Sequence, residues 1–141
     1  MFDRIRECVG MRERAATRGK AAQATAPKPP PIVDVTDKDY AEVVEGSDRL
    51  AVVDFWADWC EPCRVISAYV GFLANDYDGR VLVTALDVDE NPATAERLNI
   101  MGLPTLLLVK QGQEVGRIVG ITAYEAIKAQ VEAALQPQID P

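Results

Sequence analysis

The chain contains no histidine among its 141 residues. This absence excludes a catalytic triad with a histidine base, and it excludes metal sites with imidazole ligands. Cysteine is scarce, and one of the three copies stays unpaired in any set of intrachain disulfides. A disulfide-stabilised secreted scaffold is therefore excluded. Cys8 has no cysteine neighbour at the spacing of metal ligands, so we expect no zinc or other metal site.

Long apolar runs are also missing. No apolar run reaches the length of about 18 residues that a membrane-spanning helix needs, and no segment has the apolar centre of a secretory signal peptide. Hydrophobic residues make up 48% of the chain, a fraction that suits one compact domain with a core. These features predict a small intracellular enzyme or carrier without a membrane span.

Charge divides the chain into two parts. Residues 1–31 carry seven Lys or Arg against three acids, whereas the remainder carries eight bases and nineteen acids. The basic part ends in the run Pro27-Lys28-Pro29-Pro30-Pro31, and such runs are extended and semi-rigid. We therefore expect a basic arm and linker over 1–31, a globular domain over 32–136 and a C-terminal tail over 137–141.

The basic arm has several possible roles. Phe2, Ile5 and Val9 lie at helical spacing, which allows a short amphipathic helix over 2–18. We expect a solvated arm, with a docking segment for an acidic partner or an organellar transit peptide as alternatives. Cys8 is expected to be an inert thiol, with intermolecular disulfides or glutathionylation as alternatives.

Apolar patterns predict alternating strands and helices in the domain. A near-continuous apolar run over 50–57 is typical of a strand buried on both faces, and Gln111-Gly112 is expected to form a hairpin turn. The pattern predicts a mixed central sheet with helices on both faces, an α/β fold. The expected strands cover 32–35, 50–57, 81–88, 105–109 and 114–119, and the expected helices cover about 37–45, 62–77, 91–98 and 123–135.

Local signals add detail to these helices. Thr36 is expected to cap the first helix, with Asp39 completing a capping-box-like pair. Asn91 and Pro92 are expected to open the third helix. The second helix is expected to bury Val65, Ile66, Tyr69, Phe72 and Leu73.

Two cysteines separated by two residues, Cys60 and Cys63, follow the strand over 50–57 at the start of a helix. One helical turn brings two such sulfurs within bonding distance, and free N–H groups at the helix N-terminus favour the thiolate of the first cysteine. The pair is therefore predicted to form a reversible disulfide. Zinc sites and haem attachment use the same spacing, so the spacing alone leaves these alternatives open.

Two longer segments resemble the thioredoxin family. They are Asp54-Phe55-Trp56-Ala57-Asp58-Trp59-Cys60-Glu61-Pro62-Cys63 and Gly102-Leu103-Pro104-Thr105, with Val119-Gly120 further on. The resemblance extends over residues 33–136, nearly the whole domain. It implies a thioredoxin fold with a five-stranded mixed sheet, and it implies a general protein disulfide reductase that performs dithiol–disulfide exchange.

The resemblance also implies roles for individual residues. Cys60 would be the nucleophile and Cys63 the more shielded, resolving cysteine. Asp54, whose pKa burial would raise, would be the base that deprotonates the resolving cysteine. The alternative is a carboxylate that only finds a hydrogen-bond partner at the sheet edge. Pro104 would be a cis proline beside the site. The implied docking surface consists of Trp59, Glu61, Pro62, Gly102, Leu103 and Gly120.

Partners follow from the same resemblance. The expected electron donor is thioredoxin reductase, an NADPH-dependent flavoenzyme, and the expected substrates are proteins that contain disulfides. No cofactor is expected, because the Cys60–Cys63 dithiol itself carries the electrons. We expect a monomer with no metal and no nucleic-acid partner.

Three positions depart from the usual thioredoxin pattern. Glu61 replaces a glycine, and its charge should make Cys60 less acidic and the disulfide harder to reduce. Ala85 stands where many thioredoxins have a lysine near the buried aspartate, so the pKa of Asp54 should be higher. Ala68 replaces a proline that kinks the helix, so a straighter helix is expected.

Two other functions are compatible with parts of the pattern. A Cys-Glu-Pro-Cys site resembles that of thiol reductases of cytochrome c maturation, but those proteins carry an anchor or signal sequence and an insertion that we do not expect here. A thioredoxin-fold chaperone or structural subunit is the second alternative. The complete set of Cys60, Cys63, Asp54 and Pro104 argues against a purely structural role.

Overall fold

A computed structural model describes residues 31–137. The predicted alternation of strands and helices is confirmed, and the expectations for the basic arm and Cys8 lie outside the described residues, except for Pro31. The elements are β1 (Ile32–Asp34), η1 (Ala41–Glu45), β2 (Leu50–Trp56), α2 (Glu61–Asp76), β3 (Val81–Asp87), α3 (Pro92–Arg97), β4 (Thr105–Lys110), β5 (Gln113–Val119) and α4 (Tyr124–Leu135).

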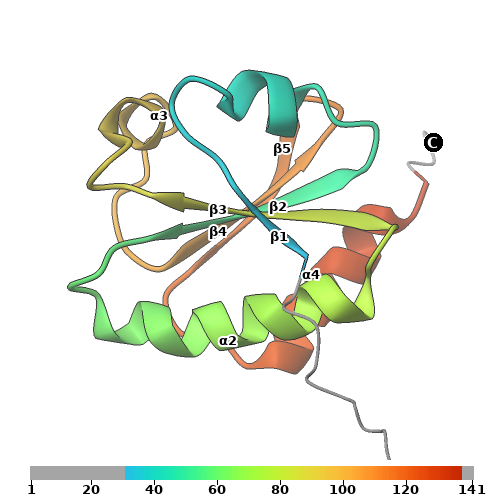
Figure 1. Ribbon diagram of the computed structural model, residues 1–141. Coiled ribbons are helices and arrows are strands. Elements are labelled where there is room, and N and C mark those ends of the chain that lie inside the picture. The colour runs from blue at the N-terminus through green and yellow to red at the C-terminus, as the bar shows by residue number, and fades with distance from the viewer. Residues whose placement is uncertain (1–30, 138–141) are drawn as a thin grey trace, which may run out of the picture.

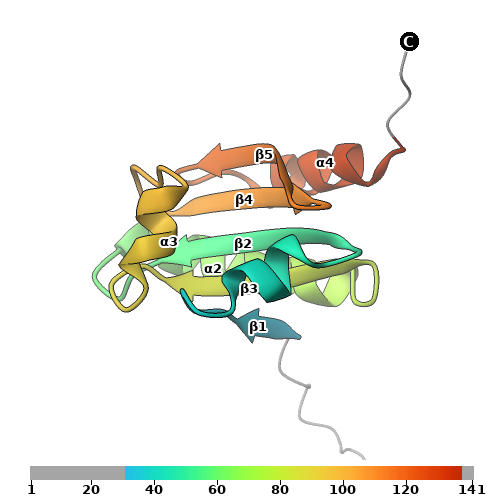
Figure 2. The same cartoon turned by 90° about the horizontal axis from the view of Figure 1, so that it is seen from above.

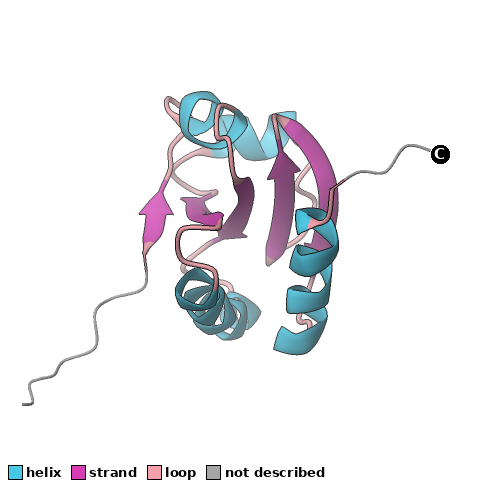
Figure 3. Cartoon of the chain, turned by 90° about the vertical axis from the view of Figure 1, so that its right-hand side faces the viewer, coloured by secondary structure: helices cyan, strands magenta, loops and turns pink. Residues whose placement is uncertain are grey.

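Five strands form one mixed sheet in the order β1-β3-β2-β4-β5, which Figure 2 shows from above. β1 and β2 pair with β3 in parallel, whereas β4 pairs antiparallel with β2 and with β5. Helices α2 and α4 cover one face, and η1 and α3 cover the other (Figures 1 and 3). The predicted α/β thioredoxin fold, with helices on both faces, is confirmed.

The central strand β2 contributes side chains to the hydrophobic cores on both faces of the sheet. Val52 points to one face and packs in a cluster with Ile66 of α2. The next residue, Val53, points to the other face and packs in a cluster with Tyr40 and Val44. Because successive side chains alternate between the faces, a strand covered on both sides must be apolar throughout.

The buried face of α2 differs from the prediction at two positions. Val65 and Phe72 were expected in the core, but they are 41% and 54% exposed. Phe72 instead makes an edge-on contact with Tyr124 of α4, with ring centroids 5.8 Å apart. The residues of α2 that face the sheet recur every three or four positions, as they must in a helix that packs against a sheet. It consists of Cys63, Ile66, Val70, Gly71, Leu73 and Ala74.

The predicted pair of Thr36 and Asp39 forms, but it closes the turn before η1 and does not cap this helix, which has no side-chain cap. The backbone N–H of Thr36 donates to Asp39 Oδ1 at 2.7 Å, and the N–H of Lys38 donates to Thr36 Oγ1 at 3.3 Å. The helical segment begins later than predicted, at Ala41, because residues 37–39 form a turn. Gly46 N–H then donates to the carbonyl of Ala41 at 2.9 Å, which closes a wide, π-helical turn.

Helix α3 is capped by a residue far from it in sequence. The side chain of Asn91 was expected to open this helix, but it makes no capping hydrogen bond. The carboxylate of Asp37 instead accepts from the N–H groups of Ala93 and Thr94, at 3.2 and 2.8 Å. Asn91 Oδ1 accepts from the N–H of Asp37 at 3.0 Å. The two side chains therefore tie together the loops that follow β1 and β3.

Helix α2 runs unbroken from Glu61 to Asp76, with Ala68 in its middle. Among residues 31–137, no helix combines the length and hydropathy that crossing a bilayer requires.

Candidate active site

Cys60 and Cys63 are joined in a disulfide at the N-terminus of α2. Cys60 is the N-cap residue with extended backbone, and Cys63 lies in the first turn, so their Cα atoms are 5.3 Å apart. Pro62 fits this turn because the first N–H groups of a helix have no partner within it. Cys60 is slightly more exposed than Cys63, at 4% against 2%. The predicted disulfide is confirmed.

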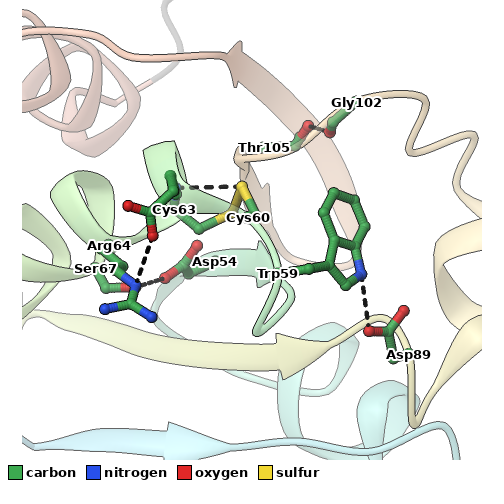
Figure 4. Close-up of a disulfide and its surroundings, with 10 residues drawn as sticks. Asp54, Trp59, Cys60, Cys63, Arg64, Ser67, Asp89, Gly102 and Thr105 are labelled. Atoms are coloured by element: carbon green, nitrogen blue, oxygen red, sulfur yellow. Dashed lines mark hydrogen bonds and ion pairs between the residues drawn. A yellow bond between two sulfur atoms is a disulfide. The ribbon is translucent and has the colours of Figure 1, made fainter.

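The helix N-terminus acts on one of the two sulfurs. The backbone N–H of Cys63 donates to Cys60 Sγ at 3.2 Å (Figure 4). This hydrogen bond and the positive end of the helix dipole both stabilise negative charge. In the reduced protein they lower the free energy of a thiolate on Cys60 relative to the thiol.

Asp54 lies in β2 and is 2% exposed. Burial raises its pKa to about 7, and a hydrogen bond from Ser67 opposes this rise. Ala85 lies directly opposite on β3 and carries no charge that would offset the burial. The expectation that burial raises this pKa is confirmed. A carboxyl group that titrates near neutral pH can both accept and release a proton.

The loop before β4 lies against the cysteines. The Leu103–Pro104 peptide is cis, as the resemblance implies, and Leu103 packs against the cluster formed by the two cysteines and Ala57. Thr105 Oγ1 donates to the carbonyl of Gly102 at 2.6 Å, and Gly120 N–H donates to the carbonyl of Pro104 at 2.8 Å. The cysteine pair and the loop before β4 are far apart in sequence, and the fold brings them into contact.

Trp59 lies on the exterior between the disulfide and α3. It is 69% exposed, and its Nε1–H donates to Asp89 Oδ2 at 2.9 Å (Figure 4). A groove of about 480 Å³ lies beside it and is also lined by Gly102 and Leu103. The structure therefore brings three of the predicted docking residues to one surface. Trp56, the last residue of β2, is half-buried and packs against the cluster that contains the two cysteines.

Some residues near the site were not singled out in the sequence. Met101, beside Gly102, is 90% exposed and lines the groove. Ile121 and Val119, the latter named above only as part of the family resemblance, lie on either side of Gly120 and are also exposed. These residues are direct neighbours of Gly102 and Gly120, so their positions in the sequence could have indicated that they lie near the site. Ser67 was missed as well, although it lies four residues after Cys63 and so on the same side of the helix.

Glu61 and Arg64 form an ion pair beside the disulfide. Arg64 Nε lies 3.3 Å from Glu61 Oε1, and both side chains are highly exposed. Within the described part of the chain, no group of three or more Cys, Asp or Glu side chains is placed to hold a metal ion.

Comparisons with known proteins agree with this geometry. The family model for thioredoxin matches residues 31–133. Thioredoxin from Staphylococcus epidermidis is 46% identical over 94 residues, which cover 67% of this chain and 88% of the relative. Thioredoxin from Staphylococcus aureus is 47% identical over the same shares of both chains. Thioredoxin from Staphylococcus saprophyticus is 41% identical over 104 residues, which cover 74% and 98%. The chain therefore belongs to the thioredoxin family and is a thiol–disulfide oxidoreductase that works through the Cys60–Cys63 pair.

Proposed function

We propose that the chain is a general protein disulfide reductase in which Cys60 is the nucleophile and Cys63 resolves the intermediate. The Cys60 thiolate attacks a substrate disulfide, which forms a mixed disulfide and releases one substrate thiolate. Cys63 then attacks Cys60 Sγ, which releases the second substrate thiolate and restores the Cys60–Cys63 disulfide. The observation that carries these roles is the hydrogen bond from Cys63 N–H to Cys60 Sγ, because it stabilises negative charge on Cys60.

Asp54 is the base in this proposal. Cys63 must lose its proton before it can attack, and Asp54 has a pKa of about 7 that suits proton transfer at neutral pH. Its Oδ1 atom has no hydrogen-bond partner within residues 31–137 and can accept a proton.

The substrate is proposed to bind along the surface around the disulfide. The proposed contacting residues are Trp59, Glu61, Pro62, Gly102, Leu103 and Gly120. The backbone of Leu103, before the cis proline, would pair with an extended substrate segment, which gives affinity with little dependence on substrate sequence. This mode of binding suits a reductase that acts on many proteins.

Family membership supports the remaining parts of the proposal. The electron donor would be an NADPH-dependent thioredoxin reductase, the substrates would be proteins with disulfides, and the chain would act as a monomer in the cytoplasm. Fractionation of the source cells tests the location, and gel filtration tests the monomer.

Reduction of insulin tests the activity. The chain should accelerate insulin reduction by dithiothreitol, Cys60→Ser should abolish the acceleration, and Cys63→Ser should accumulate a mixed disulfide on Cys60. NADPH with thioredoxin reductase should replace dithiothreitol. No acceleration, or full activity in Cys60→Ser, would contradict the proposal. Activity with dithiothreitol but none with the reductase would instead favour a specialised thiol reductase.

A further inference from the structure

Ser67 connects helix α2 to the buried carboxyl of β2 (Figure 4). Its hydroxyl donates to Asp54 Oδ2 at 3.3 Å. The other oxygen, Oδ1, is buried and has no partner among the described residues. The two oxygens of this carboxylate are therefore not equivalent, since one is held and the other is free.

Ser67 also lines two adjoining hollows, one beside Asp54 and one beside the disulfide. Asp54 lines a hollow of about 320 Å³, and Cys60 and Cys63 line a second hollow of about 350 Å³. Ser67 and Trp56 are the residues that line both. Of these two, Ser67 carries the short side chain that can both donate and accept a hydrogen bond.

Few charged groups surround Asp54. Asp34 of β1 lines the same hollow, and Ala85 of β3 lies opposite without a charge. Asp58 and Arg64 line the adjoining hollow. Within residues 31–137, no cation pairs with the buried carboxylate, and the serine hydroxyl is the one protein group that hydrogen-bonds it.

We propose that Ser67 is a positioning residue for Asp54 in the step that resolves the mixed disulfide. Its hydroxyl stabilises the carboxylate and holds Oδ2, which leaves Oδ1 to accept the proton of Cys63. The S–H bond breaks, and an O–H bond forms on Asp54. The electron pair left on the Cys63 sulfur attacks Cys60 Sγ, and the substrate sulfur departs with the pair of the broken S–S bond. The proposal rests on the proposed role of Asp54 as a base.

A single-turnover experiment separates the two steps. The reduced full chain is mixed with an equimolar aryl disulfide whose thiolate is coloured. The first release of thiolate reports the attack by Cys60, and the second reports resolution by Cys63. Ser67→Ala should slow the second release by about two- to fivefold at neutral pH and move its pH profile to higher pH. The effect is modest because Ser67 is exposed and water competes for its hydrogen bond.

Matched variants identify the cause of the slower step. Ser67→Thr keeps a hydroxyl at the same place and should restore the rate and the pH profile. Ser47→Ala removes a hydroxyl from the turn before β2 and should change neither release. Asp54→Asn should slow the second release, and adding Ser67→Ala in that background should have no further effect if Ser67 acts through Asp54.

The outcomes distinguish this proposal from the one on which it rests. If Asp54→Asn slows the second release but Ser67→Ala leaves its rate and pH profile unchanged, the role of Ser67 is overturned and that of Asp54 stands. If Ser67→Ala slows the second release by the same factor in the parent chain and in the Asp54→Asn variant, the positioning role is also overturned. If Asp54→Asn does not slow the second release, both roles are overturned.

Discussion

Glu61 places a carboxylate directly after the attacking sulfur. Its partner Arg64, at 3.3 Å, neutralises part of this charge, but both side chains are highly exposed. Water and salt screen exposed ion pairs, so such pairs contribute little free energy. The remaining repulsion between Glu61 and a Cys60 thiolate should destabilise the reduced form slightly.

Removing this charge should make the disulfide easier to reduce. Glu61→Gln and Glu61→Gly should both raise the redox potential by about 5–20 mV. This range is the free energy of an exposed charge pair, about 0.2–1 kcal/mol, converted at about 1.4 kcal/mol per 30 mV. Arg64→Gln should lower the potential. Equilibration with glutathione at low salt measures all three variants. An unchanged or lower potential in Glu61→Gly would contradict the role of the charge.

At the scale of elements, α3 depends on groups outside itself. A helix of six residues, Pro92–Arg97, is too short to be stable alone. Asp37 accepts from the N–H groups at its beginning. At its end, Arg117 of β5 donates to the carbonyls of Leu98 and Asn99, at 2.8 and 3.0 Å. Because α3 lines the groove beside Trp59, these contacts also shape the proposed docking surface.

The cap supplied by Asp37 should depend on pH. Hydrogen bonding with Thr94 holds the pKa of Asp37 below its ordinary value. A lowered pKa stabilises the folded state above the ordinary pKa, and this stability is lost as the pH falls through the folded value. Asp37→Ala should therefore lower the melting temperature by a few degrees at neutral pH and by less in acid.

Thermal unfolding followed by circular dichroism measures this effect. Asp37→Asn should keep part of the cap, because its amide oxygen still accepts. Glu42→Gln removes an acid from η1 and should have little effect. A loss in Asp37→Ala that is the same at every pH would show that the charge of Asp37 is not involved.

At the scale of the whole molecule, the ionisation of Asp54 opposes folding. Burial raises its folded pKa to about 7 from the ordinary value of 3.8. Between these two values the unfolded chain has released a proton that the folded protein retains. Stability therefore falls as the pH rises through this window, and the full cost is present above the folded pKa.

Asp54→Asn should consequently make the protein more stable at alkaline pH. The gain above about pH 8 should be on the order of 4 kcal/mol and should disappear near pH 4. Urea unfolding of the oxidised protein across this range measures it. Asp34→Asn, at an exposed position on the same hollow, is the control and should show no such gain. A gain that does not vary with pH would point to packing rather than ionisation.

Local interactions allowed most elements to be predicted from the sequence. The apolar run over 50–57 indicated the central strand, since only a strand covered on both faces needs one. The hairpin at Gln111-Gly112 followed from turn chemistry, and both residues have positive φ, 52° and 79°. The spacing of Cys60 and Cys63 predicted the disulfide because one helical turn sets their separation.

The sequence by itself thus determined the order of elements, the cysteine pair and the burial of Asp54, because these depend on neighbours within a few residues. Only the tertiary structure decided that Asp37 caps α3, that Phe72 packs outside the core and that Ser67 holds Asp54. These contacts join segments from 13 to 57 residues apart. Their existence depends on how helices and loops pack against the sheet, which no local pattern encodes.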